Sequence, residues 1–452
     1  MPNKAYVLSS VYMSTFELIL KINGFPIKKA KKKLVELNQF SFSQILKNQE
    51  EQKWNILHEH FNHNPFYKEL CNGKIPKDWH EVPVIQKKDL QKPIAQMINP
   101  IIHKKDLFLS KTAGSTGIPM VFAKDKFCHA LTWAQILHKY SLHGIKGGDM
   151  QARFYGMPIE GVYYYKERIK DILSNRRRFA VNDLSEDILE KYIVTLKKYK
   201  FKYIYGYTNS IKIFAKYLLN KGLTLKDICP TVKCCIITSE MCTPSDEKLL
   251  KDAFLVPIIN EYGASELGVI AFPDKEFQWR LSDEDLFVEV LNEKGQPVEK
   301  GAVGRLVVTS LYNRAMPIIR YELGDMASVN FSAEGNTLSC LKGRLTDTLR
   351  LPSGRIMPGA TLYIAAKIIY DNLPELKEFI IKQTSLDTIE YDLVVDGPID
   401  HKVKEDIVKL TFKYLEPGLQ VKINKVDCIK RTASGKYKFF QSYIDSPEIN
   451  RG

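Results

Sequence analysis

The sequence lacks the features that define several large protein classes. Its 452 residues contain no apolar run long enough to span a membrane and no low-complexity segment. The eight cysteines form neither a CxxC pair nor a regular framework, so we expect reduced thiols and no structural zinc. These absences predict a globular cytoplasmic protein, and a chain of this length predicts two or three domains.

The N-terminus also lacks the pattern of a secretory signal. Residues 5–22 are fairly apolar, but serine, threonine and glutamate interrupt them and no small-residue cleavage site follows. Five lysines then lie between Lys28 and Lys33, in a chain with a formal net charge of +14. Lysines scattered over solvated helix faces account for most of this charge, and we expect no nucleic-acid partner. The local cluster motivates the hypothesis of peripheral contact with an anionic membrane.

Alternating helices and strands predict the fold class of the middle of the chain. After helical patterns over 41–70, broken near 64, and over 127–143, helices are expected at 187–199, 210–219 and 245–254, with strands at 203–205, 234–238 and 256–260. This order is typical of a parallel sheet in an α/β domain. Apolar segments at 287–291 and 305–309, around a turn at 292–295, predict a β-rich portion after it.

The last part of the chain has the pattern of a second, smaller domain. A helix is expected near 362–372, then strands at 378–382 and 390–395, a helix at 403–414 and a strand at 420–426. This order predicts an independent α+β domain of about a hundred residues. We therefore divide the chain into domains 1–345 and 346–452, joined by a short hinge near 344–351.

A glycine-rich loop follows the apolar run Leu107–Leu109. It contains Thr112, Gly114, Ser115, Thr116 and Gly117. Glycines let backbone amides approach an anion and hydroxyl groups add donors, so the segment suits phosphate oxygens. It lacks the GxxxxGK[ST] spacing of a Walker loop, and on its own such a cluster is more often an ordinary surface turn.

Four later motifs change the interpretation of this loop. They read NEYGASE at 260–266, RYELGD at 320–325, GRLTD at 343–347 and KRTASGK at 430–436. Each alone is an ordinary turn, but in this order they resemble the adenylate-forming superfamily of acyl-CoA synthetases. The segments NPFY at 64–67 and PVIQKKD at 83–89 resemble the phenylacetate-CoA ligase branch in particular, with its relatives from capsular-polysaccharide loci.

The resemblance implies a large N-terminal domain with the ATP and acid sites and a small mobile C-terminal domain. It implies an AMP-forming ligase that activates a carboxylic acid as acyl-AMP and passes it to a thiol, in the first instance coenzyme A. ATP and Mg²⁺ are the implied cofactors. The implied catalytic residues are Lys436, bridging the carboxylate and the α-phosphate, Glu266, holding Mg²⁺, and Arg344, contacting the ribose or a phosphate.

The same resemblance assigns binding residues. The loop from Thr112 to Gly117 would hold the β and γ phosphates, and Asp325 both ribose hydroxyls. The other implied nucleotide contacts are Ser239, Glu240, Tyr262 and Gly263, and the implied acid-pocket residues are Tyr155, Gly206, Tyr207 and Ala264. Structural alternatives stay open for two of these residues: Tyr207 as core filler and Glu240 as a helix-entry residue. For Tyr155 and the aromatic run 163–165 two interpretations stay open, as lining of the substrate pocket or as a solvent-facing edge.

Three positions depart from the family pattern. Members usually carry serine and lysine where this chain has Ala113 and Ile118, and an acidic hinge residue where it has Thr346. The loss of a donor and a charge predicts weakened ATP affinity. These departures also motivate a non-catalytic nucleotide-binding homologue as an alternative, although Lys436, Glu266 and Asp325 are intact.

A further alternative keeps adenylation and changes the acceptor. The acyl or aminoacyl group would pass to an amine or hydroxyl group, for example on a sugar in surface-polysaccharide biosynthesis. The capsule-locus relatives and the basic N-terminus motivate it. The sequence determines neither the acid nor the oligomeric state.

Overall fold

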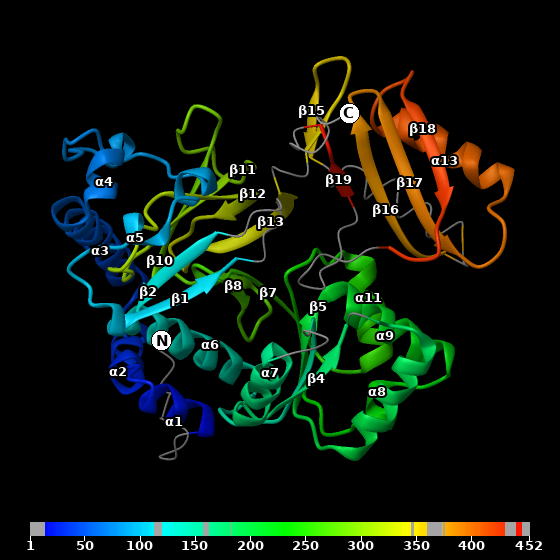
Figure 1. The fold of residues 1–452 in the computed structure, drawn as a ribbon, viewed down its shortest axis with the longest axis horizontal. Helices are drawn as coiled ribbons and strands as arrows, with labels where there is room; N and C mark the ends of the chain where they lie inside the picture. Colours follow the sequence, from blue (N-terminus) through cyan, green and yellow to red (C-terminus); the bar gives the residue numbers. More distant parts are fainter. Residues whose placement is uncertain are drawn as a thin grey trace. The chain divides into compact units, whose positions relative to one another are not determined.

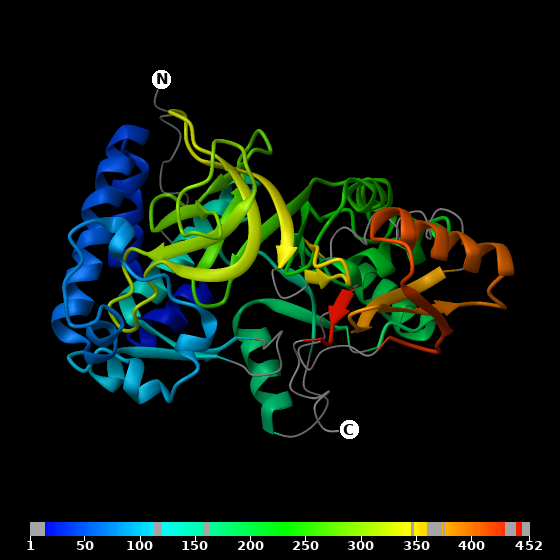
Figure 2. The same ribbon diagram turned by 90° about the horizontal axis from the view of Figure 1, so that it is seen from above.

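The computed structural model describes residues 14–112, 120–156, 162–181, 183–344, 348–358, 373, 376–429 and 440–444, without the side chains of 162–163, 342–344, 348 and 356–358. Contacts divide the chain into two compact units (Figures 1 and 2). The large unit comprises residues 1–323 and 328–339, and the small unit 324–327 and 340–452. The domain boundary at 345–346 and the helix near 362–372 lie outside the described residues and stay predictions.

Helices open the large unit. They are α1 (Thr15–Ile22), α2 (Ile27–Asn38), α3 (Phe42–His63), α4 (Pro65–Leu70) and α5 (Ile94–Met97), with 3₁₀ turns at Trp79–Glu81, Lys87–Leu90 and Lys104–Asp106. The predicted break near residue 64 is confirmed, because the Asn64 side chain caps α4 by accepting the Tyr67 amide and Pro65 starts the new helix. The sequence reading left α1 and α2 unassigned.

A hairpin flanks the predicted phosphate loop. Strands β1 (Leu107–Lys111) and β2 (Val121–Asp125) pair antiparallel, with Lys111 opposite Val121. Asp125 then caps α6 (Lys126–Leu142) by accepting the amides of Phe127 and Cys128, so the predicted helix after the loop is confirmed. Buried residues of α1, α2 and α6 pack together beneath this hairpin.

A parallel layer follows, as the alternating pattern predicts. Its strands are β3 (Gln151–Tyr155), β4 (Arg176–Ala180), β5 (Tyr203–Tyr207), β6 (Cys234–Thr238) and β7 (Ile258–Ala264), in the spatial order β7-β6-β5-β3-β4. The helices between them are α7 (Val162–Leu173), α8 (Glu186–Lys198), α9 (Thr208–Asn220), α10 (Leu225–Ile228) and α11 (Pro244–Phe254). The sequence reading missed β3, β4 and α7, and it started β7 two residues early.

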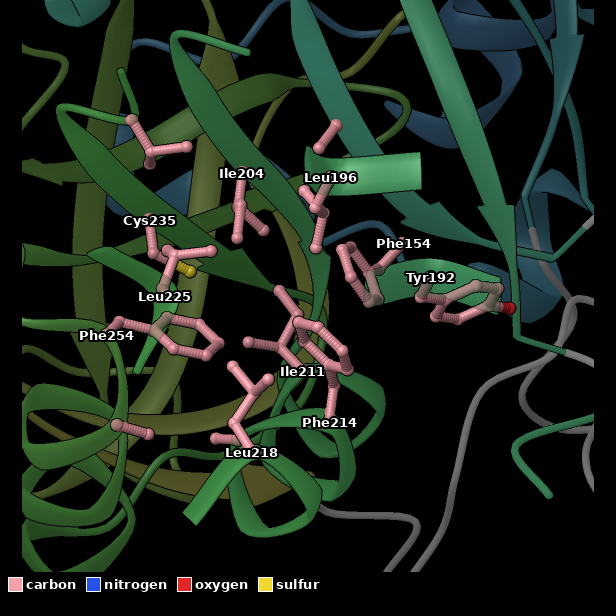
Figure 3. Close-up of a cluster of buried hydrophobic side chains, with 14 of the residues drawn as sticks. Phe154, Tyr192, Leu196, Ile204, Ile211, Phe214, Leu218, Leu225, Cys235 and Phe254 are labelled. Carbon is pink, nitrogen blue, oxygen red and sulfur yellow. The ribbon is translucent and has the colours of Figure 1, made fainter. Parts of the chain in front are cut away.

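Both faces of the parallel layer are covered, which explains why every residue of β6 is buried. Cys235 lies with Phe214 of α9 and Phe254 of α11 on one face (Figure 3). Ile236 packs with Tyr140 of α6 on the other face. The parallel part of the large unit therefore has three layers, with helices on either side of the strands.

Antiparallel strands extend the same sheet. They are β8 (Gly268–Pro273), β9 (Trp279–Leu281), β10 (Leu286–Leu291), β11 (Gly304–Ser310), β12 (Tyr321–Asn330) and β13 (Thr337–Arg344). Within the described residues one sheet thus has eleven strands, in the order β10-β11-β12-β13-β9-β8-β7-β6-β5-β3-β4. The predicted pairing of 287–291 with 305–309 is confirmed, but residues 292–303 form a longer connection than the predicted four-residue turn.

The small unit is α+β, as predicted. Its sheet has the order β18-β17-β16-β19, from β16 (Leu376–Ser385), β17 (Thr388–Val395), β18 (Gln420–Lys425) and β19 (Phe440–Ser442). Helix α13 (His401–Tyr414) covers it and buries Ile407 in the core, and β14 (Thr348–Arg350) pairs with β15 (Ile356–Pro358). Among the described helices of either unit, none has the length and hydropathy required of a membrane span.

Candidate active site

Several of the predicted site residues meet at one edge of the parallel layer, where strands β3, β5, β6 and β7 end. Tyr207 pairs with Thr238, and Thr238 with Glu261, so these strand ends lie level with one another. Tyr155 ends β3 beside them, because Phe154 pairs with Gly206. In open parallel sheets, ligands bind outside the carboxyl ends of the strands. The topology therefore gathers the residues that the motifs singled out.

The packing of strand β5 explains the glycine at position 206 and places the ring of Tyr207. A Cβ atom at Gly206 would lie 2.3 Å from the Phe154 carbonyl oxygen, so β3 and β5 pack this closely only around a glycine. The Tyr207 ring lies 4.0 Å from the Tyr155 ring, centroid to centroid, and burial raises the pKa of Tyr207. Gly206 thus has a structural reason. Tyr155 is half-buried at the strand ends, whereas Tyr207 is 2% exposed and belongs to the hydrophobic core, as its interpretation as core filler expects.

Ser239 and Glu240 follow β6 in an unusual backbone conformation. Ser239 has a φ of 70°, which a residue other than glycine rarely adopts. The next residue turns back to α9: Glu240 Oε2 accepts the Asn209 amide at 2.7 Å, and the Glu240 carbonyl accepts the Thr208 hydroxyl at 3.2 Å. A carboxylate at a helix N-terminus is favourable. The helix-entry interpretation of Glu240 therefore has direct structural support.

The motif NEYGASE forms the end of β7 and its turn into β8. A Cβ atom at Gly263 would lie 2.4 Å from the Gly268 carbonyl oxygen, and the ladder shifts register between Tyr262 and Gly263. The turn therefore requires glycine at 263. Tyr262 is half-buried, with its ring centroid 6.2 Å from that of Trp279, and Ala264 ends the strand.

Glu266 lies just after this strand and is buried, with 6% of its surface exposed. Tyr321 Oη donates to Glu266 Oε1 at 3.2 Å, and within the described residues no hydrogen bond to Oε2 is found. A buried carboxylate with an oxygen to spare suits a hard cation such as Mg²⁺. No three His, Cys, Asp or Glu side chains converge on a metal position in the described part of the chain.

Lys124 is a buried cation that the sequence reading missed. It lies on β2, the first strand after the phosphate loop, and its Nζ donates to Thr132 Oγ1 at 3.1 Å. Burial lowers the pKa of Lys124, while the nearby carboxyl groups, which include Asp285 and Glu266, oppose this shift. The sequence signal for a buried lysine was its position directly after the apolar residues 121–123 and before Asp125. Lys124 is thus a basic residue of the large unit, in which the predicted phosphate loop has Ile118 where the family usually has lysine.

A second missed group lies on the α6 side of the strands. Glu261 Oε2 accepts the Tyr140 hydroxyl at 2.9 Å, and Oε1 accepts the Tyr205 hydroxyl at 3.0 Å. Burial raises the pKa of Glu261. The Arg153 guanidinium lies 4.3 Å from the Tyr155 ring centroid and 4.9 Å from that of Tyr205. The sequence signal for this polar group was the alternation of polar or tyrosine side chains along β3 and β5. Alternate residues of a strand lie on the same face of the sheet.

The remaining predicted residues fall into two groups. Thr112 closes the mouth of the loop, because its amide donates to the Met120 carbonyl and its hydroxyl accepts the Met120 amide. Asp325 is buried on β12, and Arg344 ends β13 with its side chain outside the described residues. Gly114, Ser115, Thr116, Gly117 and Lys436 lie outside the described residues, so their roles stay predictions.

With this geometry established, comparison with known proteins places the chain among its relatives. It is 24% identical to Protein CapK of Staphylococcus aureus over 374 residues, which span 80% of this chain and 79% of that protein. It is 22% identical to phenylacetate-coenzyme A ligase of Thermus thermophilus, over 76% of this chain and 80% of that protein. No protein-family model matches the chain.

A solved structure has the same fold over nearly the whole chain. The crystal structure of 2-hydroxyisobutyryl-CoA ligase, in complex with 2-HIB-AMP, superposes with a TM-score of 0.67 over 90% of each chain, at 16% sequence identity. The fold is that of an adenylate-forming enzyme with a C-terminal domain, as the sequence predicts. The sequence relatives and the fold together support the adenylate-forming superfamily and its phenylacetate-CoA ligase branch.

Proposed function

We propose that this protein is an AMP-forming acid–thiol ligase. It joins a carboxylic acid to the α-phosphate of ATP with release of pyrophosphate, and then transfers the acyl group to coenzyme A. The observation that carries this proposal is the buried Glu266 carboxylate beyond the strand ends, in a chain similar to phenylacetate-coenzyme A ligase. ATP, Mg²⁺ and coenzyme A as ligands of this chain are part of the proposal.

The chemistry requires the site to gather negative charge and to stabilise more of it as pyrophosphate leaves. Mg²⁺ would supply positive charge to the phosphate oxygens, and Glu266 would hold it. Lys124 would keep the local field positive where the loop has lost its own lysine. Asp325 would accept both ribose hydroxyls, and the Tyr155 ring would form one wall of the acid pocket. An apolar wall of this kind orients an acid without adding charge.

The proposal assigns the bridging charge in the transition state to Lys436 on the small unit. Lys436→Ala should abolish acid-dependent exchange of labelled pyrophosphate into ATP while ATP binding persists, because the lost contact forms as the reacting groups meet. Lys409→Ala is the matched control, since Lys409 lies on the same unit and its side chain is 72% exposed. Exchange that continues unchanged in Lys436→Ala would remove Lys436 from the mechanism.

A second candidate concerns only the acceptor. The identity to Protein CapK is at least as high as that to the coenzyme A ligase, so similarity does not favour coenzyme A over an amine or hydroxyl group. The discriminating experiment follows AMP release with an aryl or aliphatic acid, ATP and either coenzyme A or an amino sugar. AMP release that requires the amino sugar would replace the thiol with an amine or hydroxyl acceptor.

A further inference from the structure

Helix α7 turns its acidic side chains towards the sheet. Asp171 Oδ1 lies 2.6 Å from Arg176 Nε and 3.0 Å from Arg178 Nη2, and Glu167 Oε2 lies 2.7 Å from Arg178 Nη2. Arg176 and Arg178 project from β4, and the guanidinium of Arg178 is almost fully buried. Ion pairs therefore hold this helix against the strand.

The opposite side of α7 is apolar and exposed. Tyr165, Ile169 and Ile172, together with Leu173, recur at spacings of four, three and one residues, which places them on one helical stripe. All four side chains are exposed, and Ile172 is 75% exposed. The exposed charged residues of the helix are Lys166, Arg168 and Lys170, all of them basic, and Lys170 Nζ also lies 2.7 Å from Glu167 Oε1. An amphipathic helix normally buries its apolar stripe, so this helix is turned the other way round.

Helix α1, which contacts α7, packs Leu20 into the core but also buries its acidic side chain. Its one acidic residue, Glu17, is buried and paired with Lys31 of α2. Its exposed residues include Leu18, Lys21 and Ile22, and Ile22 is 75% exposed. In both helices the carboxylates pair with basic groups of the protein, while several large apolar side chains and basic groups are exposed. We call the exposed residues Leu18, Ile22, Tyr165, Ile169, Ile172 and Leu173 the α1/α7 surface.

The lysine cluster predicted for membrane contact is less available than its sequence suggests. Lys31 pairs with Glu17, Lys33 lies 3.1 Å from Glu36, and Lys29 lies 5.3 Å from the Phe127 ring centroid. Three of the five lysines thus have partners within the protein. The large exposed apolar side chains that membrane contact also requires are concentrated on α1 and α7, with only Val35 exposed on α2.

We propose that the α1/α7 surface binds the surface of an anionic phospholipid membrane. Helices that lie in a membrane interface combine an apolar stripe with flanking basic residues, and anionic headgroups attract such residues. A membrane fits better than a second copy of this chain. Two-fold pairing of α7 with itself would bring Lys166, Arg168 and Lys170 against the same basic residues. The net charge of +14 adds to the attraction for an anionic surface.

The test is flotation of the full chain with vesicles of phosphatidylcholine containing phosphatidylglycerol. Ile169→Glu combined with Ile172→Glu should lower the partition into these vesicles about tenfold or more, because each change removes an apolar contact and adds a repelled charge. Val194→Glu is the matched control, since Val194 lies on α8 and is 61% exposed, and its partition should be unchanged. Circular dichroism would verify that each variant is folded.

Two further arms separate the charge from the apolar contact. Vesicles of phosphatidylcholine alone should bind weakly, and Lys166→Gln, Arg168→Gln and Lys170→Gln together should reduce binding to the anionic vesicles several-fold. Salt at 1 M should weaken binding, since it shortens the screening length to about 3 Å. Equal binding of the Ile169/Ile172 double variant and its parent would overturn the proposal. So would a concentration-dependent dimer, abolished by the same double variant, in a chain that binds no vesicle.

Discussion

Glu261 and Glu266 are two buried carboxylates, five residues apart, at the end of the same strand and the turn that follows it. Glu261 accepts two tyrosine hydroxyl groups and lies near Arg153, so its hydrogen-bonding capacity is taken up by the protein. Glu266 accepts one tyrosine hydroxyl group on one oxygen, with the cation of Lys124 nearby. Within the described residues, protein groups hydrogen-bond both oxygens of Glu261, whereas for Glu266 a hydrogen bond is found on Oε1 alone.

The comparison teaches that burial alone does not identify a catalytic acid. Both side chains are removed from water, but a carboxylate that is fully hydrogen-bonded to protein groups stabilises the fold, whereas one with a spare oxygen can hold a cation. The difference comes from neighbours that are distant in sequence: Tyr140 and Tyr205 for Glu261, and Tyr321 for Glu266.

The largest expected effect is on catalysis, from Glu266→Gln. The amide keeps the shape of the side chain but cannot hold Mg²⁺ as a carboxylate does, so pyrophosphate exchange should fall at least about 100-fold. The Mg²⁺ dependence of nucleotide binding should disappear with it. Thermal unfolding should change little. A variant that binds ATP with the parent's Mg²⁺ response would contradict the difference drawn between the two carboxylates.

A smaller catalytic effect is expected from Lys124→Met, which removes the buried charge and keeps the length of the side chain. The value of kcat/KM for ATP should fall about tenfold, because positive charge near the phosphates is lost. Stability should be unchanged or higher, since a desolvated ammonium group is costly to bury. The exposed Lys248→Met, on α11, is the control. Full activity in Lys124→Met would show that Glu266 acts without this cation.

Around Glu261 the expected effects are on stability. Tyr205→Phe and Tyr140→Phe each remove a hydrogen bond to a buried carboxylate, so each should lower the free energy of unfolding by about 1 to 2 kcal/mol. The activity of the folded enzyme should change less than about threefold. Tyr217→Phe, whose hydroxyl group donates to the exposed Glu190, is the control and should cost under about 0.5 kcal/mol. A large loss of activity without a loss of stability would move Glu261 into the catalytic site.

The smallest expected effect is a change in the pH dependence of stability. Burial raises the pKa of Glu261 above its usual value of 4.5. As the pH rises past that value the unfolded chain ionises first, so the contribution of Glu261 to stability falls until the folded pKa is reached. Urea unfolding of Glu261→Gln across pH 4 to 8 should therefore show a flatter decline than the parent chain. Parallel profiles would mean that the folded and unfolded pKa values coincide.

Much of the fold followed from local patterns. The strand and helix alternation from residue 187 to 260 predicted a parallel layer, because strands covered on both faces are continuously apolar, as in β6. Helix α7 was not predicted from the sequence, because its hydrophobic pattern does not match its packing. Its buried side is charged and its exposed side apolar, so hydrophobicity does not indicate which side packs on the sheet.

The candidate site divides in a similar way. The motifs, through the resemblance that they carry, predicted roles for Glu266, Tyr262 and Asp325, because the residues of such motifs lie close together in the chain. Lys124 belongs to no motif, and Glu261 lies within NEYGASE without an implied role, so only their burial and their partners distinguish them from ordinary surface residues.

The sequence by itself determined the class of protein and its α/β and α+β parts, and it predicted the members of the candidate nucleotide site. These depend on local periodicity and on short motifs. Tertiary structure decided which carboxylate is satisfied by protein groups, where a buried cation lies and which apolar residues stay exposed. Those outcomes depend on contacts between residues such as Tyr140 and Glu261, 121 positions apart, and no local pattern records them.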